Sequence, residues 1–577
     1  MAVRSSDLRS EEAAARNAEA PPGRRIALHS LLLPNVQLAI GLIYLASFVG
    51  FAVRGRFEFP YRDDWDWLRV LLTRPLTLPY LFEPHNEHVI PLPRALFALQ
   101  YALEGMTGYL IFGIALATQI VIGLAFWRQI RTRWPAQPDM RRFAWGLAAV
   151  NVFFTYQLQS IVLVAGILFP LVLMFAVIAC AAAVSGSWPI AIAATVGAML
   201  TTTNGLIVPF VVAVLVAASP RPNRMWVLFA VLQAVSIGGY LAVITDPWNH
   251  APVPADQAWA WTSPTAALSF FLAFFSSAVT YAGPVAGVLA GTVCFAVACS
   301  ALWDVFVGRR GQALPVERFA AALLLFTIVS AGMTTIGRAQ FGVLQAAQSR
   351  YASFTVVFWA ALIVWALSRF EATSLWSRWK RGVMAFTIAC TIAGLAAQVF
   401  GGILWVAKAD NLKFAEQTLA AGVDDDTWIA TLHPEMHRVY EARALLTAAG
   451  RWDLTDERLG SAVGPLANVA CAGSMRSFPA MPGPGWRVEG NLSASGTHAI
   501  VAGTRGTVTG VAMRAPIVDV ANPMQMDVLA AVWHRIVDGR PSLPKWGGFA
   551  RSDVGRPSLL IVVGNDDRPE CQIPVTP

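Results

Sequence analysis

The sequence predicts an α-helical protein that crosses a membrane several times and ends in a small β-rich domain. Of the 577 residues, 56% are hydrophobic and 14% are charged, whereas a typical soluble domain has about 25% charged residues. The mean hydropathy is +0.53, because the apolar residues form long runs of the length that a membrane-spanning helix needs. After about residue 465 these runs give way to short Val- and Gly-rich segments, which are typical of strands.

The N-terminal segment is residues 1–31, of which residues 1–25 are polar and Ala-rich and include several arginines. We predict a disordered cytoplasmic tail rather than a cleaved signal peptide, because the apolar run that follows is long enough to span a bilayer.

A helical membrane region is expected over residues 32–406, with about 11 transmembrane helices. The predicted spans are 32–53, 108–127, 142–158, 161–183, 188–206, 207–219, 225–244, 284–303, 319–337, 351–368 and 383–406. Several are shorter than the roughly 20 residues of a straight span, so we expect those to lie inside the bundle. Residues 265–282 are also apolar, but as a span they would place Arg309 and Arg310 outside, so we predict a re-entrant or interfacial helix.

Basic residues in the short loops predict the orientation. The loops that we place inside carry Arg128, Arg131, Arg133, Arg141, Arg142, Arg221, Arg224, Arg309, Arg310, Arg318, Arg369, Arg378, Lys380 and Arg381. The N-terminus is then cytoplasmic, and one external face carries the loops 54–107, 246–283 and 338–350 and everything after about residue 407. These loops explain the net charge of +8. We expect no nucleic-acid binding, because no basic stripe is interleaved with base-stacking aromatics.

The external C-terminal part is expected to have two regions. Residues 407–464 show apolar spacings of three and four and predict a helical connector. Residues 465–577 predict a small β-sandwich. Cys471 and Cys571 bracket it and are a natural disulfide pair outside the cytoplasm, which would stabilise it by roughly 4–5 kcal/mol in the chain-entropy model. The other four cysteines lie in apolar runs and are expected to be small buried residues.

The acidic segment Arg62-Asp63-Asp64-Trp65-Asp66-Trp67 follows the first span. Ionised groups near a bilayer are costly, and a carboxylate there is a candidate general base or metal ligand. Because neighbouring side chains point in different directions, we expect one of Asp63 and Asp64 to face a given site. The alternative is a capping role at the start of an aromatic-rich helix.

A polar stretch, His85-Asn86-Glu87-His88, lies on the same predicted face. As a metal-binding motif it is weak, since it lacks the H-E-x-x-H spacing. We predict instead that His85, Glu87 and His88 bind substrate or orient the aspartates, the alternative being an ordinary polar loop.

Arg338 and Arg350 bracket a short external loop, and Arg350 precedes Tyr351 at the start of a span. Arginines at this depth can bind a phosphate with two parallel hydrogen bonds or can simply snorkel to ordinary phospholipids. There is no P-loop and no G-x-G-x-x-G between a strand and a helix, which disfavours an enzyme that uses cytoplasmic nucleotides.

In their order and common sidedness these motifs resemble the family C (GT-C fold) glycosyltransferases, most closely bacterial members of unassigned acceptor. The resemblance covers about residues 32–406 and not the C-terminal β domain. The motifs that carry it are Asp63-Asp64-Trp65, His85 to His88, Tyr156-Gln157-Leu158-Gln159, Asn204-Gly205 and Ser349-Arg350-Tyr351.

The resemblance implies an inverting glycosyltransferase of the bacterial inner membrane that takes a sugar from a polyprenyl-phosphate donor. The acceptor would be an extracytoplasmic glycan or glycolipid. Asp63 or Asp64 would be the general base, and Arg350 and Arg338 would bind the leaving phosphate. Some family members use a divalent metal, Mg or Mn, at the acidic loop and others use none, and one aspartate pair does not decide between them.

Two other functions are compatible with the sequence. One is a transporter or flippase of a lipid-linked saccharide, although no internal repeat is present. The other is a non-catalytic membrane scaffold whose β domain binds glycan or protein.

Overall fold

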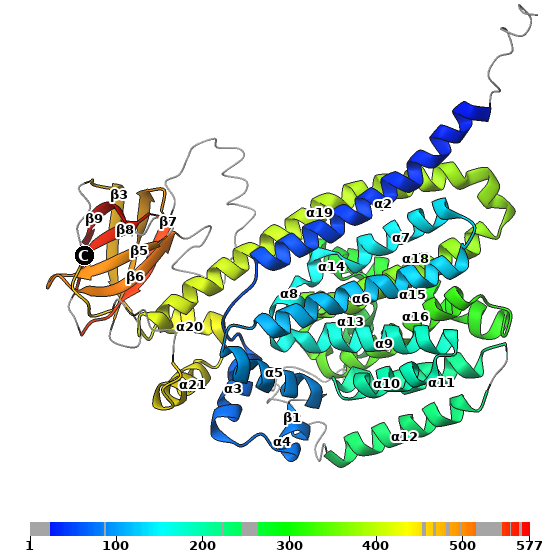
Figure 1. The fold of residues 1–577 in the computed structure, drawn as a ribbon, viewed down its shortest axis with the longest axis horizontal. Helices are drawn as coiled ribbons and strands as arrows, with labels where there is room; N and C mark the ends of the chain where they lie inside the picture. The colour runs from blue at the N-terminus through cyan, green and yellow to red at the C-terminus, as the bar shows by residue number, and fades with distance from the viewer. Residues whose placement is uncertain are drawn as a thin grey trace, which may run out of the picture.

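The computed structural model shows a mostly helical protein with a β-barrel near its C-terminus (Figure 1). The residues that it describes are 23–85, 88–220, 223–243, 263–452, 457, 459–464, 469–480, 485–496, 498–514, 545–553, 556–564 and 568–577.

The α-helices are α2 (Gly23–Arg54), α3 (Asp63–Thr73), α4 (Leu78–Phe82), α5 (Pro91–Glu104), α6 (Tyr109–Arg133), α7 (Pro138–Val152), α8 (Leu158–Val162), α9 (Leu168–Ser185), α10 (Trp188–Met199), α11 (Val208–Ala217), α12 (Met225–Val243), α13 (Pro264–Phe274), α14 (Ser277–Ala282), α15 (Pro284–Trp303), α16 (Pro315–Arg338), α17 (Val343–Ala346), α18 (Ser349–Glu371), α19 (Ser374–Ala420), α20 (Asp426–Leu432) and α21 (Met436–Ala448). Short 3-10 or π segments are η1 (Thr155–Gln157), η2 (Ala165–Ile167), η3 (Thr203–Ile207), η4 (Asp304–Gly308) and η5 (Ala339–Phe341).

Among the described residues, eight helices are long and apolar enough to cross a membrane, fewer than the predicted spans. They are Leu32–Arg54, Tyr109–Arg133, Ala165–Ser185, Met225–Val243, Pro284–Gly308, Pro315–Phe341, Ser349–Glu371 and Ser374–Ala420. The predicted spans 142–158, 188–206 and 207–219 are shorter helices in the structure, α7, α10 and α11. Residues 265–282 fold as the two short helices α13 and α14, neither of which is long enough to span.

Buried polar side chains explain why the predicted span at 142–158 ends early. Helix α7 stops at Val152, whose carbonyl accepts a hydrogen bond from Gln157 Nε2 at 2.6 Å. The backbone N–H of Thr155 donates to Gln398 Oε1 on α19 at 2.9 Å. These side-chain bonds replace helical ones, so an apolar run becomes a short helix followed by η1 and α8.

The N-terminal boundary and two cysteines differ from expectation. Helix α2 begins at Gly23, so residues 23–31 of the predicted tail are helical, and residues 1–22 lie outside the described part of the chain. Cys180 and Cys294 are buried as predicted, but Cys299 and Cys390 are exposed. An apolar run of a membrane helix includes a face toward lipid, so apolar sequence does not imply burial in protein.

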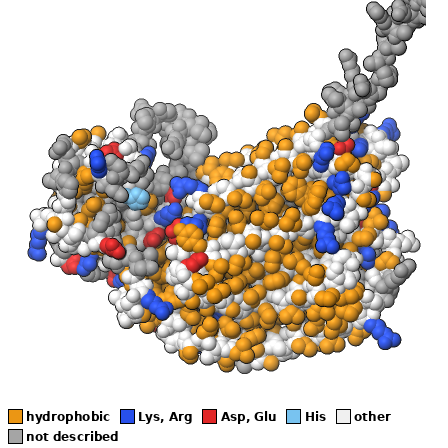
Figure 2. All heavy atoms as spheres, viewed as in Figure 1, with side chains coloured by type: hydrophobic (Ala, Val, Ile, Leu, Met, Phe, Trp, Pro, Cys, Tyr) orange, Lys and Arg blue, Asp and Glu red, His pale blue; other side chains and the backbone are white. Residues whose placement is uncertain are grey.

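The long helices run alongside one another, with α2 and α19 side by side, and α3, α4 and α5 lie at the same end of the bundle as α20 and α21 (Figure 1). Figure 2 shows hydrophobic side chains over the middle of the helical body, with charged side chains toward its two ends. This is the surface expected of a membrane-embedded bundle. Which end is cytoplasmic stays a prediction.

The C-terminal strands form one closed barrel rather than the predicted sandwich. Its order is β3-β4-β7-β6-β5-β8-β9, and it closes because β3 pairs with β9 in parallel at Met475↔Val575 and Arg476↔Thr576. The strands are β3 (Ala472–Pro479), β4 (Trp486–Ser493), β5 (His498–Gly503), β6 (Val508–Arg514), β7 (Lys545–Ala550), β8 (Pro557–Val563) and β9 (Pro569–Thr576). A barrel without open edges needs no second sheet to cover it.

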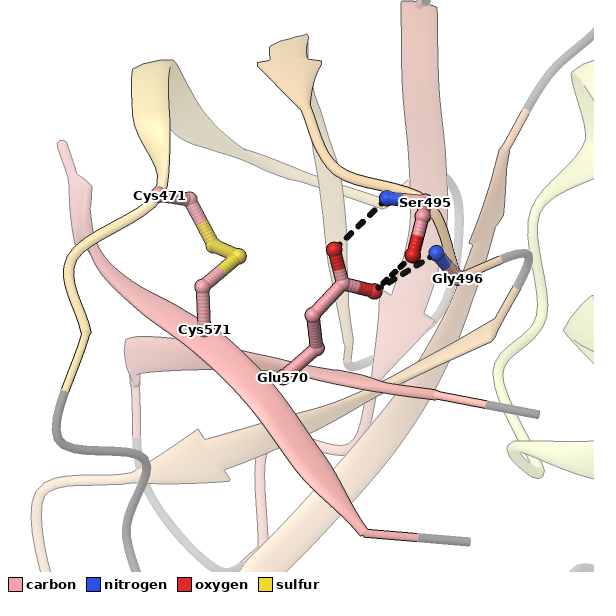
Figure 3. The surroundings of a disulfide bond; sticks show 5 residues. All are labelled: Cys471, Ser495, Gly496, Glu570 and Cys571. Carbon is pink, nitrogen blue, oxygen red and sulfur yellow. Dashed lines mark hydrogen bonds between the residues drawn. A yellow bond between two sulfur atoms is a disulfide. The ribbon is translucent and has the colours of Figure 1, made fainter. Parts of the chain in front are cut away.

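The predicted disulfide between Cys471 and Cys571 is confirmed and closes a loop with a sequence separation of 100. It ties the residue before β3 to β9 (Figure 3). Beside it, the Glu570 carboxylate accepts hydrogen bonds from the backbone N–H groups of Ser495 and Gly496, each at 2.7 Å. The turn between β4 and β5 is thereby held against β9.

Candidate active site

Asp64, at the start of α3, is bound by backbone N–H groups at both of its carboxylate oxygens. Its side chain is buried, its Oδ2 accepts from the Tyr61 N–H at 3.0 Å, and its Oδ1 accepts from the Ala165 N–H of η2 at 2.7 Å. Burial raises the pKa of Asp64 to about 8 against the opposing effect of these two hydrogen bonds, and the charge of Asp63 raises it further. Both carboxylate oxygens are therefore used within the protein, although not in the helix-capping role given above as the alternative, because no side-chain cap hydrogen bond is present at the start of α3.

Asp63 has the opposite environment, although it is the adjacent residue. Its side chain is 49% exposed, and its Oδ2 lies 3.6 Å from Nε2 of His85 on the strand β1 (Pro84–His85). Partial burial raises the pKa of Asp63, but His85 and then Arg350 and His433 outweigh it and lower the pKa to about 2. The carboxylate is therefore ionised at neutral pH and accessible.

His85 is held by aromatic packing and by its hairpin. Its ring stands edge-on to Trp67 with centroids 5.7 Å apart. The strand β2 (His88–Val89) pairs with β1 and places His88 opposite His85. His88 Nδ1 lies 2.9 Å from Thr203 Oγ1 in η3. His88 thus ties the hairpin to η3. Glu87, like Asn86, lies outside the described residues.

Arg350 lies at the start of α18 and acts on Asp63 through its charge. The side chain is half-buried, and its Nε is buried without a hydrogen-bond partner among the described residues. A buried donor without a partner costs on the order of 1–3 kcal/mol, and an anion beside the guanidinium would remove that cost. The start of α18 is held in place by the preceding residue, because Ser349 Oγ donates a hydrogen bond to the Tyr156 carbonyl.

The other two predicted binding residues are not brought to Asp63 in the same way. The ring of Tyr351 is buried against Phe169 and Phe274, with centroids 6.2 and 5.9 Å away. It forms part of the aromatic core beneath Arg350. Arg338 is half-buried at the end of α16, with its guanidinium carbon 5.9 Å from the centroid of the Phe341 ring. A role for either residue in substrate binding stays a prediction.

The described residues contain no group of three or more His, Cys, Asp and Glu side chains that could hold a metal ion. Asp63 and His85 offer two suitable ligands, fewer than a metal site built from protein ligands normally has. The divalent metal therefore stays a prediction, and the chemistry below is derived from the side chains.

Two residues near the acidic segment, Arg438 and His433, were missed by the sequence argument, and both face Asp66. Asp66 is buried on α3, its Oδ1 lies 2.6 Å from Nη1 of Arg438, and its Oδ2 lies 3.6 Å from Nε2 of the buried His433. Arg438 is 372 residues from Asp66 in the sequence. No local pattern could have paired them, because residues so far apart are brought together only by the fold.

Comparison with known proteins gives little further constraint. No protein-family model matches the chain, and no curated protein matches it significantly. Two solved structures of ArnT from Cupriavidus metallidurans match at 16% identity. The apo structure has a TM-score of 0.35, covering 70% of this chain and 76% of that one. The structure with bound undecaprenyl phosphate has a TM-score of 0.32, covering 78% and 84%. Superpositions this loose assign this chain neither a shared fold nor a ligand.

Proposed function

We propose that the protein is a membrane glycosyltransferase that moves a sugar from a polyprenyl-phosphate donor to an extracytoplasmic glycan or glycolipid. One observation carries the proposal: an ionised, half-exposed Asp63 lies within electrostatic reach of Arg350, whose buried Nε has no partner among the described residues. A base beside an unsatisfied cation suits transfer from a phosphate. The apolar bundle that carries them suits a lipid-linked donor.

The proposed reaction is a single displacement with inversion. The acceptor hydroxyl oxygen bonds to the anomeric carbon as the bond from that carbon to the phosphate oxygen breaks. Asp63 takes the hydroxyl proton, and polyprenyl phosphate leaves with the bonding electron pair. Arg350 stabilises the negative charge of the leaving phosphate, which is usually the larger contribution, and base catalysis adds on the order of 10²–10⁴-fold.

A carboxylate with a pKa of about 2 is a weak base, because efficient proton transfer needs a pKa nearer the working pH. The donor itself offers a remedy. A phosphate bound to Arg350 neutralises one of the charges that lower the pKa of Asp63. In this proposal donor binding therefore raises the basicity of Asp63 at the moment when the acceptor must be deprotonated.

The proposal is tested by comparing Asp63→Asn with Asp64→Asn in membranes supplied with radiolabelled polyprenyl-phosphate hexose or pentose. We expect Asp63→Asn to lower transfer by about 10²–10⁴-fold at unchanged protein level, whereas Asp64→Asn mainly lowers stability. Arg350→Gln should raise the KM for the donor by about tenfold or more. Arg378→Gln, an exposed arginine of α19, is the matched control.

Two outcomes would contradict the proposal. Full transfer by Asp63→Asn would remove the base assignment. Movement of intact lipid-linked sugar across vesicles, with no glycosidic product, would favour a flippase instead.

A further inference from the structure

A helical hairpin from the C-terminal connector, α20 with α21, is tied at three points to the acidic segment and to the part of α3 that follows it. The Arg62 N–H donates to the Leu432 carbonyl at 2.8 Å. Arg438 forms an ion pair with Asp66 at 2.6 Å. Arg69 Nη1 lies 3.0 Å from Glu441 Oε2. These contacts run from the residue before Asp63 along α3, against which α21 packs (Figure 1).

The first of these contacts holds a strained residue. Arg62 has φ 53° and ψ −121°, and among the described residues it is the one non-glycine with a positive φ. Such a conformation costs on the order of 1–3 kcal/mol and persists only where the surroundings enforce it. Here Asp64 holds the Tyr61 N–H on one side, and Leu432 holds the N–H of Arg62 itself. Because Arg62 directly precedes Asp63, its backbone angles set where the Asp63 carboxylate lies.

His433 follows Leu432 and reaches the same cluster. The side chain is buried, Nδ1 lies 3.0 Å from the Glu435 backbone nitrogen, and Nε2 faces Asp66 at 3.6 Å. Its charge also contributes to the lowered pKa of Asp63. The turn between α20 and α21 therefore presents one backbone carbonyl and one imidazole to the start of α3.

We propose that the α20–α21 hairpin is a working part of the active site, in which His433 and Arg438 are positioning residues that hold Asp63 in its reactive orientation. This rests on the proposed function, in which Asp63 takes the acceptor proton. The contacts are polar and partly buried, and such pairs are poor sources of net stability compared with apolar packing. Polar pairs are better suited to fixing the orientation of a side chain. A catalytic side chain that is misplaced by about 1 Å can lower the rate by about 10²-fold.

The test uses the full-length protein and three variants of α21. Arg438→Gln removes the ion pair with Asp66, and Arg438→Lys keeps the charge. Arg443→Gln is the matched control, because Arg443 lies on the same helix but pairs with Asp424 inside the connector at 2.6 Å. With radiolabelled polyprenyl-phosphate hexose or pentose as donor, we expect Arg438→Gln to lower kcat by about tenfold or more with little change in KM. Arg438→Lys should recover part of the loss.

His433→Asn and the Arg62 variants test the route through the backbone. We expect His433→Asn to lower kcat as Arg438→Gln does. Glycine adopts a positive φ without strain, so Arg62→Gly should retain more activity than Arg62→Ala, although both lack the side chain. The proposal is overturned if Arg438→Gln and His433→Asn match Arg443→Gln in kcat.

A readout without turnover separates this proposal from the proposed function. Hydrogen exchange of the amides in residues 61–68 should be faster in Arg438→Gln than in Arg443→Gln. If Asp63→Asn retains transfer while hydrogen exchange is still faster in Arg438→Gln, then the base role of Asp63 is wrong, but the hairpin nevertheless holds α3. If exchange does not rise, the positioning proposal fails whatever Asp63 does.

Discussion

Two neighbouring aspartates at the start of α3 show how one residue step separates two different environments. The Asp64 side chain turns inward and satisfies two backbone N–H groups, whereas Asp63 is half-exposed beside His85. Successive residues of a helix point in different directions, so only one of the two can face the site. This difference is why the proposed mechanism uses Asp63 as the base.

The raised pKa of Asp64 predicts how stability changes with pH. Its folded pKa of about 8 lies above the ordinary value of 3.8, so between these values the folded state holds a proton that the unfolded chain loses. The contribution of Asp64 to the free energy of unfolding is therefore at its maximum below about pH 4 and is lost as the pH rises toward 8. We expect the wild type to melt at a lower temperature at pH 8 than at pH 5, and Asp64→Asn to reduce this difference. An unchanged difference in Asp64→Asn would contradict the assignment.

The sequence singled out the acidic motif because carboxylates close to a bilayer are costly, and the arginine at the start of α18 because the positive-inside bias disfavours arginines in an external loop. It could not say which aspartate is buried, since that depends on the N–H of Ala165, which lies 101 residues away. The sequence did not indicate His433 either, because the residue that it faces, Asp66, is far from it in the sequence. Contacts between distant residues are decided by helix packing, which local patterns do not encode.

At the scale of elements, α2 and α7 are in close backbone contact. A Cβ atom on Gly146 would lie 2.4 Å from the Gln37 carbonyl oxygen, and one on Gly41 would lie 2.8 Å from the Gly146 carbonyl oxygen. Small residues allow membrane helices to approach so closely that dispersion forces hold them together without a hydrophobic effect. Helix α2 leads directly into the first loop, which contains α3.

This contact predicts a difference between two glycine substitutions. We expect Gly146→Ala to destabilise the protein by about 1–3 kcal/mol, because the added methyl group meets backbone that cannot move aside. Gly113→Ala on α6 is the control, since a Cβ there meets nothing within 4 Å, and it should be neutral or stabilising by about 0.5–1 kcal/mol. Thermal unfolding in detergent measures both. Equal effects would show that the two helices do not meet as described.

The elements themselves were predicted unevenly. Long apolar runs identified the spanning helices, because length and hydropathy are local properties. The early end of α7 depends on Gln398, a buried side chain of α19 that binds the Thr155 N–H, and no pattern within the predicted span shows it. The predicted β-sandwich was wrong, because β3 pairs with β9 and so joins the two ends of the domain into a closed barrel.

At the scale of the whole molecule, the barrel is connected to the candidate active site through the connector. Phe414 of α19, Trp428 of α20 and Phe549 of β7 pack together, with Phe414 5.3 Å from Phe549 and 4.4 Å from Trp428 between ring centroids. Beside them Arg487 of β4 pairs with Asp425 at 2.9 Å. Since Asp425 also accepts the Thr427 N–H at the start of α20, one carboxylate joins the barrel to the hairpin that holds the Arg62 backbone.

This connection gives a last prediction. The Asp425 side chain is fully buried, so Arg487→Ala leaves a buried carboxylate without its ion pair, which typically costs about 3–5 kcal/mol. Arg551→Ala breaks an exposed pair with Asp553 on the same barrel and should cost less than about 1 kcal/mol. Thermal unfolding and the proteolysis rate of residues 485–496 measure the two. Adding Asp425→Asn to Arg487→Ala should recover part of the loss, because the unpaired charge is removed. If Arg487→Ala is as stable as Arg551→Ala, the barrel is docked by its apolar contacts alone and the ion pair has no part in holding the hairpin.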